Sequence, residues 1–419
     1  MDGFFVFAIL LLLQSFLSLR GGFRFLRLLR KSLRLPPAPY HPRAAVIIPC
    51  KGCDEDLERN AARYLAQDYP SHQVIFVVAS ESDPAYGFLA SLIRQDRQKH
   101  ESSRLDEISK IPVTNPLSSA LVVAGYSNHS GEKVNNLLAG LRAVDAGVEA
   151  LVFADIDAEP HPGWLRALVA PLGDPAVTVS TGFRWYLPGA RFASRLRAAW
   201  DSSIATMMGE HRHNLAWGGS MAIRRADFNR LRIAEDYWQG TVSDDYALAR
   251  AVREAGGTIR FEPRCLLASR NLGGFMEFLR WANRQIIITR VYHARYWKLG
   301  VASYALYALT FVWGLALILL SGSSVSRVAA AAMLSAIIAL GMAKGALRSV
   351  AAREIFPSEA STLARYGACY WRLTPLVPWV MFWNFAVAGF VRRIEWRGTV
   401  YELKSKTELK VIRRGNEVL

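Results

Sequence analysis

Cysteine is scarce in this sequence, which has four among 419 residues. Cys50 and Cys53, in "CKGC", have the spacing of a redox motif, but they stand where an apolar strand ends in a turn. No second closely spaced pair completes a zinc site, since Cys265 and Cys369 are far apart in the chain. We therefore expect four reduced cytosolic thiols rather than a metal or redox centre.

Nucleic-acid-binding motifs, internal repeats and low-complexity stretches are also missing, although the chain is strongly basic. Lysine and arginine number 51 against 35 aspartates and glutamates, a net charge of +16. Apolar residues nevertheless make up 52% of the chain. That combination favours a membrane protein with a cytosolic face over a soluble enzyme. We expect the run "RLLRKSLR" to contact lipid headgroups and to fix the topology, with no nucleic-acid partner.

Charged residues are absent from residues 3–19, a run rich in Phe and Leu. It is short for a span, because about 20 residues are needed to cross a bilayer. A cleaved signal peptide would carry its basic residues before the apolar part, with a small-residue cleavage site after it. Here the basic residues come afterwards, from Arg20 to Arg34. We therefore expect residues 1–40 to be a signal-anchor helix and its basic flank, with the N-terminus outside and the chain entering the cytoplasm from Arg20 onward.

Two more uncharged runs, residues 301–326 and 328–343, stand near the other end of the chain. Neither has a polar face, which argues against a helical hairpin buried in a soluble domain. We expect two spans joined by a short turn, which return the chain to the cytoplasm at Lys344 and Arg348. These runs open a C-terminal membrane part, residues 301–391.

The last apolar run, residues 373–391, is interrupted by Pro375 and Pro378. It either crosses the membrane or is re-entrant. The basic tail that follows, residues 392–419, favours the cytoplasmic side and hence the re-entrant interpretation. In that case we expect the run to pack against the hairpin or the soluble region. The start of the tail would then lie near the mouth of a site in that region, with Trp396 at the membrane interface.

Strands alternate with helices in a soluble-looking region, residues 41–270. "AAVIIPCKG", "QVIFVVASESDPA", "LVVAG" and "ALVFADID" have the composition of buried strands, and "LERNAARYLAQDYP" and "GEKVNNLLAGLRAV" have helical spacing. This alternation predicts an α/β fold with a parallel sheet and helices on both faces. Ligands bind such sheets beyond the carboxyl ends of the strands.

Carboxylates follow two of the predicted strands directly: Asp83 after one, and Asp155 and Asp157 after another. Two neighbouring carboxylates repel each other, so something positive should hold them. Mg²⁺ or Mn²⁺ is a natural candidate, because these ions use one or two carboxylates together with substrate phosphates. Aspartates that cap turns and helices are the ordinary alternative for "DID" considered alone.

Three later motifs favour the functional interpretation. "GGSMAIRR" is followed by "SDDYALARAVREAGG", in which Asp244 and Asp245 begin a helix at the end whose dipole favours anions. "EFLRWANRQ" then places Arg280 and Trp281 on another helix. In this order, with apolar segments on both sides, the motifs resemble the membrane-bound GT-A glycosyltransferases of family 2 and the ceramide-glucosyltransferase-like family 21. The resemblance covers about residues 41–290 and implies a mixed, mainly parallel, Rossmann-like sheet with N-terminal and C-terminal transmembrane helices.

The resemblance also implies roles for the residues of the first motifs. It gives Asp83, in "SESDPA", a position beside the nucleotide. Lys133, in "GEKVNNL", would contact the nucleotide or its phosphates. Asp155 and Asp157 match the metal motif, and Asp155 would also contribute to nucleotide-sugar binding.

For the later motifs the resemblance implies catalytic and binding roles. "SDDY" matches the segment of the catalytic base, which aligns best with Asp245 and places Asp244 beside it. Arg280 and Trp281 match a (Q/R)xxRW motif that binds the donor and shapes the acceptor site. Glu277 stands where that motif has Gln or Arg, which puts the contacts of this one position in doubt.

The residue chemistry agrees with this resemblance. The diphosphate of a nucleotide-sugar needs its charge neutralised, and one carboxylate is enough to take the acceptor's proton in a single displacement. We therefore expect an inverting hexosyltransferase that uses a nucleotide-sugar such as a UDP-hexose, with Mg²⁺ or Mn²⁺, and a lipid acceptor such as ceramide. A processive polysaccharide synthase and a non-catalytic membrane scaffold remain as alternatives.

For two predicted helical segments, the sequence does not decide between a protein core and the membrane surface as their environment. "RFASRLRAAWDSSIATMMGE" carries apolar residues at four-residue steps, with its arginines off that stripe. Its helix either faces a core or lies on the bilayer. Residues 271–300 have the same mixed character, and we expect there an interfacial helix that carries the RW motif. If both lie on the membrane, the active site opens at the lipid surface of an integral membrane protein.

Overall fold

The computed structural model describes residues 2–53, 56–106, 119–211, 213–270, 273–415 and 417–418. They form two compact units, each described by itself. The helical unit comprises Met1–Lys31, Trp185–Gly209 and Arg270–Arg392, and the sheet unit comprises Ser32–Arg184, Glu210–Ser269 and Arg393–Leu419. Residues 271–272 of the expected interfacial segment, and residues 416 and 419 of the tail, lie outside the described part of the chain.

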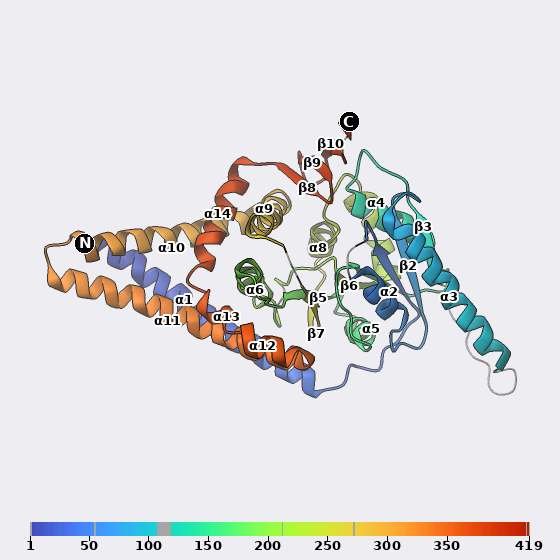
Figure 1. The fold of residues 1–419 in the computed structure, drawn as a ribbon, viewed down its shortest axis with the longest axis horizontal. Helices are drawn as coiled ribbons and strands as arrows, with labels where there is room; N and C mark the ends of the chain where they lie inside the picture. The colour runs from blue at the N-terminus through green and yellow to red at the C-terminus, as the bar shows by residue number, and fades with distance from the viewer. Residues whose placement is uncertain are drawn as a thin grey trace. The chain divides into compact units, whose positions relative to one another are not determined.

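A seven-stranded sheet is the framework of the sheet unit, in the order β3-β2-β1-β4-β6-β5-β7 (Figure 1). Its strands are β1 Ala44–Pro49, β2 His72–Val78, β3 Ala120–Val123, β4 Ala150–Ala154, β5 Val179–Tyr186, β6 Ser220–Arg224 and β7 Ile259–Ser269. β1 is parallel to β2 and β4, and β2 to β3, whereas β6 is antiparallel to β4 and β5. The expected mixed, mainly parallel sheet is confirmed.

Helices cover both faces of this sheet, because alternate strand residues point to opposite sides. Val46 and Ile48 of β1 pack in one core with α2 Leu57–Leu65, α3 Pro84–Asp106 and α5 Trp164–Val169. Ala45 and Ile47 pack in a second core with α4 Glu132–Leu141, α7 Arg225–Arg230 and α8 Asp244–Glu254. Two short turns, η1 Ala170–Gly173 and η2 Ile233–Tyr237, complete the unit. Both faces being buried explains why the central strands are continuously apolar.

The basic tail folds into a second, antiparallel sheet within the sheet unit. Its strands are β8 Arg393–Trp396, β9 Thr399–Leu403, β10 Leu409–Arg414 and β11 Glu417–Val418, in the order β11-β10-β9-β8. Alternate residues of β9, namely Thr399, Tyr401 and Leu403, are buried. That period of two, with one face buried, is the pattern of a packed strand rather than of a loose extension.

Three helices among the described residues are long and apolar enough to cross a membrane, and all belong mainly to the helical unit. They are α1 Asp2–Arg34, α10 Ala294–Leu320 and α11 Ser324–Ile355. α1 lies alongside the α10–α11 hairpin (Figure 1), where Lys344 Nζ donates to Ser18 Oγ at 2.7 Å. Arg30 pairs with Glu354 at 2.7 Å. The expected apolar N-terminal helix and helical hairpin are thus present, with the short turn at residues 321–323, and the signal-anchor role stays a prediction.

The third apolar run of the C-terminal part forms a helix that is shorter than the three candidate spans. α14 Val377–Phe390 has 14 residues, about 21 Å at 1.5 Å per residue against a hydrocarbon core of about 30 Å. It packs against α9 Phe275–Tyr292 and α10. Trp297 Nε1 donates to the Phe385 carbonyl at 3.1 Å, and Asn384 Nδ2 donates to Asn283 Oδ1 at 2.7 Å. These contacts satisfy polar groups within an otherwise apolar segment.

Short helices fill the segment between α11 and β8, and whether this segment is re-entrant stays a prediction. Glu354, at the end of α11, is paired with Arg30, which stands just before the sheet unit begins at Ser32. Arg392 leads directly into β8 of the same sheet unit. The part between them contains η3 Pro357–Glu359, α12 Ala360–Tyr366, α13 Cys369–Arg372 and α14.

The helix in "RFASRLRAAWDSSIATMMGE", α6 Phe192–Ala205, faces the core of the helical unit along its middle. Trp200 is fully buried and Nε1 donates to Asn384 Oδ1 at 3.1 Å, whereas Phe192 at the start is exposed. Arg197 lies off the four-residue apolar stripe but is nevertheless buried. That side chain is buried with its guanidinium 4.0 Å from the ring centres of both Tyr186 and Trp281, because aromatic faces stabilise a cation there.

Candidate active site

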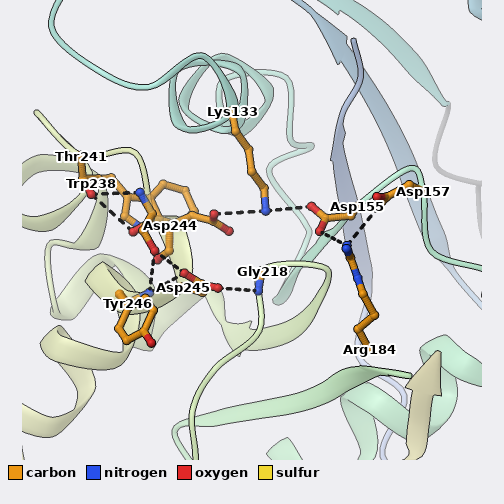
Figure 2. A network of polar contacts seen from close by, with 11 residues as sticks. Lys133, Asp155, Asp157, Arg184, Gly218, Trp238, Thr241, Asp244, Asp245 and Tyr246 are labelled. Carbon is orange, nitrogen blue, oxygen red and sulfur yellow. Dashed lines mark hydrogen bonds and ion pairs between the residues drawn. The ribbon is translucent and has the colours of Figure 1, made fainter. Parts of the chain in front are cut away.

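Asp155 and Asp157 lie just beyond the carboxyl end of β4 and share one arginine (Figure 2). Arg184 Nη2 is 3.2 Å from Asp155 Oδ2 and 3.2 Å from Asp157 Oδ1. Asp157 is the more open of the two, with its side chain 42% exposed. The guanidinium therefore neutralises both carboxylates where the strand leaves the core.

Lys133 connects this pair to the start of α8. Its Nζ lies 2.8 Å from Asp155 Oδ1 and 3.1 Å from Asp244 Oδ1, as Figure 2 shows. Lys133 stands in the first turn of α4, which packs against β1 and β2. The Gly131 N–H, just before α4, donates to the Thr241 carbonyl at 2.9 Å and holds the two helix starts together. One ammonium thus joins residues that are 22 and 111 positions away in sequence.

The two aspartates of "SDDY" have different surroundings. Asp244 is 2% exposed, pairs with Lys133, and its buried Oδ2 has no hydrogen-bond partner among the described residues. Asp245 is half-buried, and its carboxylate accepts hydrogen bonds from the hydroxyl of Ser243 and from the Tyr246 N–H at 2.7 Å. Ser243 is the N-cap of α8. Asp244 is therefore an internal ion-pair partner, and Asp245 is the carboxylate with access to solvent.

Gly218 of the Gly-Gly-Ser segment lies against both aspartates. A Cβ at this position would be 2.3 Å from Asp244 Oδ2 and 2.7 Å from Lys133 Nζ. Its N–H points to Asp245 Oδ2 at 3.4 Å. The absence of a side chain therefore lets the Lys133–Asp244 pair approach the loop before β6. This close approach explains why glycine occupies the position.

Asp83 lies on a neighbouring loop rather than in the carboxylate network. Its Oδ1 accepts from the Gly52 N–H at 2.8 Å and from the Ala85 N–H at 2.9 Å, so it caps α3 and holds the loop after β1. Because β1 lies between β2 and β4, that loop is at the same edge of the sheet as Asp155. The nucleotide-side role of Asp83 stays a prediction.

Arg184 is the residue of this site that the sequence analysis missed. It stands on β5, and its guanidinium also lies 5.2 Å from the ring centre of Trp217. The sequence offered one indication of this residue, a charged side chain within the apolar strand segment "STGFRWY", but the segment matches no motif. The role of a single charged residue in a strand can be assigned only when the residues that it contacts in the folded sheet are known.

Arg280 and Trp281 belong to the helical unit, on α9, and their roles toward a donor or acceptor stay predictions. Arg280 is exposed, and its Nε donates to the Met276 carbonyl at 3.4 Å. Trp281 is half-buried, with its ring centre 5.3 Å from that of Trp200 and 5.5 Å from that of Tyr186. Trp281 is thus part of an aromatic cluster that also encloses Arg197.

Each of the four cysteines is described, and each is a free thiol. Cys50 is buried, and burial raises its pKa well above the ordinary thiol value. A buried thiol that resists ionisation is a poor nucleophile and a poor metal ligand. Cys50 therefore has the environment of a structural residue, whereas Cys53 is exposed.

Burial and the network charges set the protonation of the site in opposite directions. Burial raises the pKa of Asp244 to about 7, against the attraction of Lys133 and with help from the neighbouring Asp245 and Asp155. For Asp155, burial also acts upward, but Lys133 and Arg184 outweigh it and hold its pKa below the ordinary value. Lys133 is penalised by burial, yet Asp155 and Asp244 raise its pKa. At neutral pH the ammonium and Asp155 are therefore charged, and Asp244 is close to its titration point.

This pKa of Asp244 predicts a pH-dependent stability. We expect the melting temperature of the wild-type chain in EDTA to fall, relative to that of Asp244→Asn, as pH rises from about 5 to about 8. The folded pKa of about 7 exceeds the ordinary value of 3.8, so the folded chain binds the extra proton in this window and loses stability as it dissociates. Thermal unfolding in detergent across this range is the measurement. A difference that does not change with pH would show that Asp244 does not titrate there.

Asp155 and Asp157 offer suitable oxygen donors for a divalent cation. Their carboxylates are close enough to share one guanidinium, and Asp157 is open to solvent. Among the described residues, no group of three or more His, Cys, Asp or Glu side chains could hold a metal ion. A site with two carboxylates fits Mg²⁺ or Mn²⁺, which commonly keep waters and take substrate phosphates as further ligands. The residues therefore fit such an ion together with an anionic substrate.

Solved structures and a curated relative resemble parts of this chain. The mannosyltransferase PcManGT from Pyrobaculum calidifontis, in complex with GDP-Man and Mn²⁺, is 17% identical, covers 92% of this chain and 97% of its own, and has a TM-score of 0.46. Glucosyl-3-phosphoglycerate synthase from Mycobacterium tuberculosis, with Mn²⁺, UDP and glucosyl-3-phosphoglycerate, is 17% identical over 59% of this chain and 79% of its own, with a TM-score of 0.37. At these values neither bears on the donor or the metal of this chain.

Sequence similarity is more informative. A ceramide glucosyltransferase from Komagataella phaffii is 32% identical over 125 residues, 29% of this chain. The match spans about a fifth of that relative's length, 21%. The profile of glycosyl transferase family 21 matches residues 10–409, nearly the whole chain including the membrane helices. The chain therefore belongs to glycosyl transferase family 21.

Proposed function

We propose that this protein transfers a hexose from a nucleotide-sugar, a UDP-hexose, to a membrane lipid acceptor such as ceramide or a related lipid, with inversion at the anomeric carbon. The observation that carries the proposal is the network in which Lys133 joins Asp155 to Asp244 (Figure 2). It gathers carboxylates and cations at the edge of the sheet where α/β folds bind their ligands.

Asp245 has the environment of the general base. It is half-buried, and its carboxylate is oriented by the Ser243 hydroxyl and the Tyr246 N–H. Asp244 beside it is held by Lys133 and is almost closed to solvent. One accessible carboxylate can take the acceptor's proton in a single displacement, and this supports inversion.

Asp155 and Asp157 would hold a divalent cation, which supplies charge neutralisation to the departing nucleoside diphosphate when bound. In the same region Lys133 and Arg184 orient these carboxylates through contacts of 2.8 and 3.2 Å. A preorganised set of charges needs no rearrangement as the leaving group develops its charge, which is the main source of such stabilisation.

The membrane helices support a lipid acceptor. Three helices among the described residues can span a bilayer, and they are integral to the matched family region. The basic flank at the C-terminal end of α1 supports a cytoplasmic position for the sheet unit, because positively charged flanks stay on that side. The partial match to a ceramide glucosyltransferase agrees with a sphingolipid-like acceptor.

A methyl group at Gly218 tests whether this network is the catalytic machinery. We expect Gly218→Ala to lower transfer by about 10²-fold, because displacing catalytic groups by about 1 Å has effects of that size. The added Cβ would meet Asp244 Oδ2 at 2.3 Å and must push the pair with Lys133 aside. Gly87→Ala on α3, where a Cβ meets nothing within 4 Å, is the matched control. Normal turnover of Gly218→Ala would contradict the assignment.

Mass spectrometry of lipid extracts from cells with and without the full-length protein tests the proposed function. A new hexosyl lipid, absent from cells that carry Asp245→Asn, is the expected result. A long saccharide product would instead indicate a processive synthase. If purified protein in nanodiscs neither transfers nor hydrolyses nucleotide-sugars with Mn²⁺, the proposal fails, and the result favours the non-catalytic membrane scaffold.

A further inference from the structure

The C-terminal sheet contacts the loop that follows β1. Arg397 Nη1 donates to the Lys51 carbonyl at 2.5 Å, and Lys51 Nζ donates to Thr399 Oγ1 at 3.3 Å. A Cβ on Gly52, the next residue, would lie 4.0 Å from Arg397 Nη1. Since β1 pairs directly with β4, whose end carries Asp155, this loop is beside the carboxylate pair. The tip of the β8–β9 hairpin therefore reaches the edge of the sheet that holds the site.

A second set of contacts joins β9 to the first turn of α4. The Glu132 N–H donates to the hydroxyl of Tyr401 at 3.2 Å, and the Glu132 carboxylate pairs with Lys51 at 2.8 Å. The next residue is Lys133, which bridges Asp155 and Asp244. The hairpin thus holds both the loop after β1 and the helix start that supplies the central ammonium.

The C-terminal sheet packs closely against the rest of the sheet unit. Tyr401 and Thr399 are buried, as is Leu403 further along β9. Gly240, in the segment that leads to α8, approaches the β9–β10 loop so closely that a Cβ would lie 2.0 Å from the Thr407 carbonyl oxygen. Such a close approach of two backbones indicates that the C-terminal strands are a packed part of the unit.

The position of Arg397 is conformationally unfavourable for its residue type. Arg397 and Gly398 have φ values of 46° and 79°, the left-handed pair that a two-residue hairpin turn requires. Asn or Gly adopts the first position more readily than arginine, because the Cβ of an L-residue crowds the backbone in the left-handed conformation. The guanidinium is nevertheless held at the loop after β1, where Nη1 donates to the Lys51 carbonyl.

On the basis of the nucleotide-sugar reaction proposed above, we infer that the β8–β9 hairpin is part of the donor site, and that Arg397 is a positioning residue for the nucleoside diphosphate. It holds the loop formed by Lys51 and Gly52, and it adds positive charge beside the place that Asp155 and Lys133 define for the phosphates. The C-terminal strands are then a component of donor recognition rather than only a topology signal.

Donor binding by full-length protein in detergent, with UDP and Mn²⁺ in a calorimeter, tests this inference. We expect Arg397→Ala to raise the Kd for UDP and the KM for the donor by roughly 10-fold, the effect of losing one charge-assisted contact, with kcat little changed. Arg397→Lys keeps the charge and should restore part of the affinity. Lys404→Ala, which removes an exposed partner of Glu408 on the same sheet, should leave UDP binding unchanged.

The possible outcomes separate this inference from the proposed function. If the wild type binds UDP and Arg397→Ala binds it equally well with an unchanged KM, the inference is overturned and the proposed function stands. If the wild type binds neither UDP nor GDP, both fail. Should Arg397→Ala not fold, Arg397→Gln retains a donor for the Lys51 carbonyl without the charge, and an unchanged UDP affinity there would equally overturn the inference.

Discussion

Replacing Asp245 with asparagine is expected to lower the rate of glycosyl transfer by roughly 10²–10⁴-fold while donor binding is retained. The amide oxygen can still accept the hydrogen bond that the Tyr246 N–H now donates to the carboxylate at 2.7 Å. It cannot take a proton from the acceptor hydroxyl. Asp245 is half-buried, whereas its neighbour Asp244 is 2% exposed and paired with Lys133, so only Asp245 is placed to meet an acceptor.

The measurement is single-turnover transfer at saturating donor, together with calorimetric binding of UDP. Asp236→Asn is the matched control, because that carboxylate pairs only on the surface of the same unit, with Arg232 at 2.9 Å. We expect the control to transfer at the wild-type rate. If Asp244→Asn proves more damaging than Asp245→Asn, the base is the buried aspartate and the assignment within "SDDY" is off by one.

Removing the carboxylate of Asp157 is expected to abolish metal-dependent transfer and to leave the fold intact. Its side chain is 42% exposed, and the contact that it loses, with Arg184 at 3.2 Å, resembles a surface ion pair worth about 0–1 kcal/mol. Arg184 keeps Asp155 as a partner in the variant. The cation, in contrast, loses one of its two candidate protein ligands.

Titration of Mn²⁺ followed by electron paramagnetic resonance separates binding from turnover in Asp157→Ala. We expect weaker Mn²⁺ binding in the presence of UDP, no measurable transfer, and a melting temperature in EDTA close to that of the wild type. Asp68→Ala is a suitable control, because Asp68 pairs with Arg166 on the surface with its own side chain 70% exposed. Turnover that survives the loss of Asp157 would remove this residue from the metal site.

The four parallel strands, the helices between them and the membrane-spanning helices were predictable from the sequence. A strand buried on both faces is apolar throughout, and β1, β2 and β4 each have such runs. A membrane span must be apolar over about 20 residues, which α10 and α11 satisfy. Both signals are local, so no partner has to be known to find them.

The order of motifs also predicted which chemistry gathers at the sheet edge, but not the contacts among its members. Asp155, Asp244 and Lys133 were each singled out with separate roles. The fold makes them one network, and it assigns Lys133 to two carboxylates at 2.8 and 3.1 Å. Arg184 was missed altogether, because its significance depends on where β5 places it relative to the end of β4.

The sequence by itself determined that this protein has a membrane part and an α/β part with acidic residues at strand ends, since periodicity and hydropathy are properties of consecutive residues. Tertiary structure decided what the last segments do. α14 is a helix of 14 residues that packs against α9 and α10, and β8, β9 and β10 form a sheet whose β8–β9 hairpin contacts Lys51 and Glu132, more than 260 positions earlier. Such contacts depend on chain closure over long separations, and composition showed only that these residues are basic.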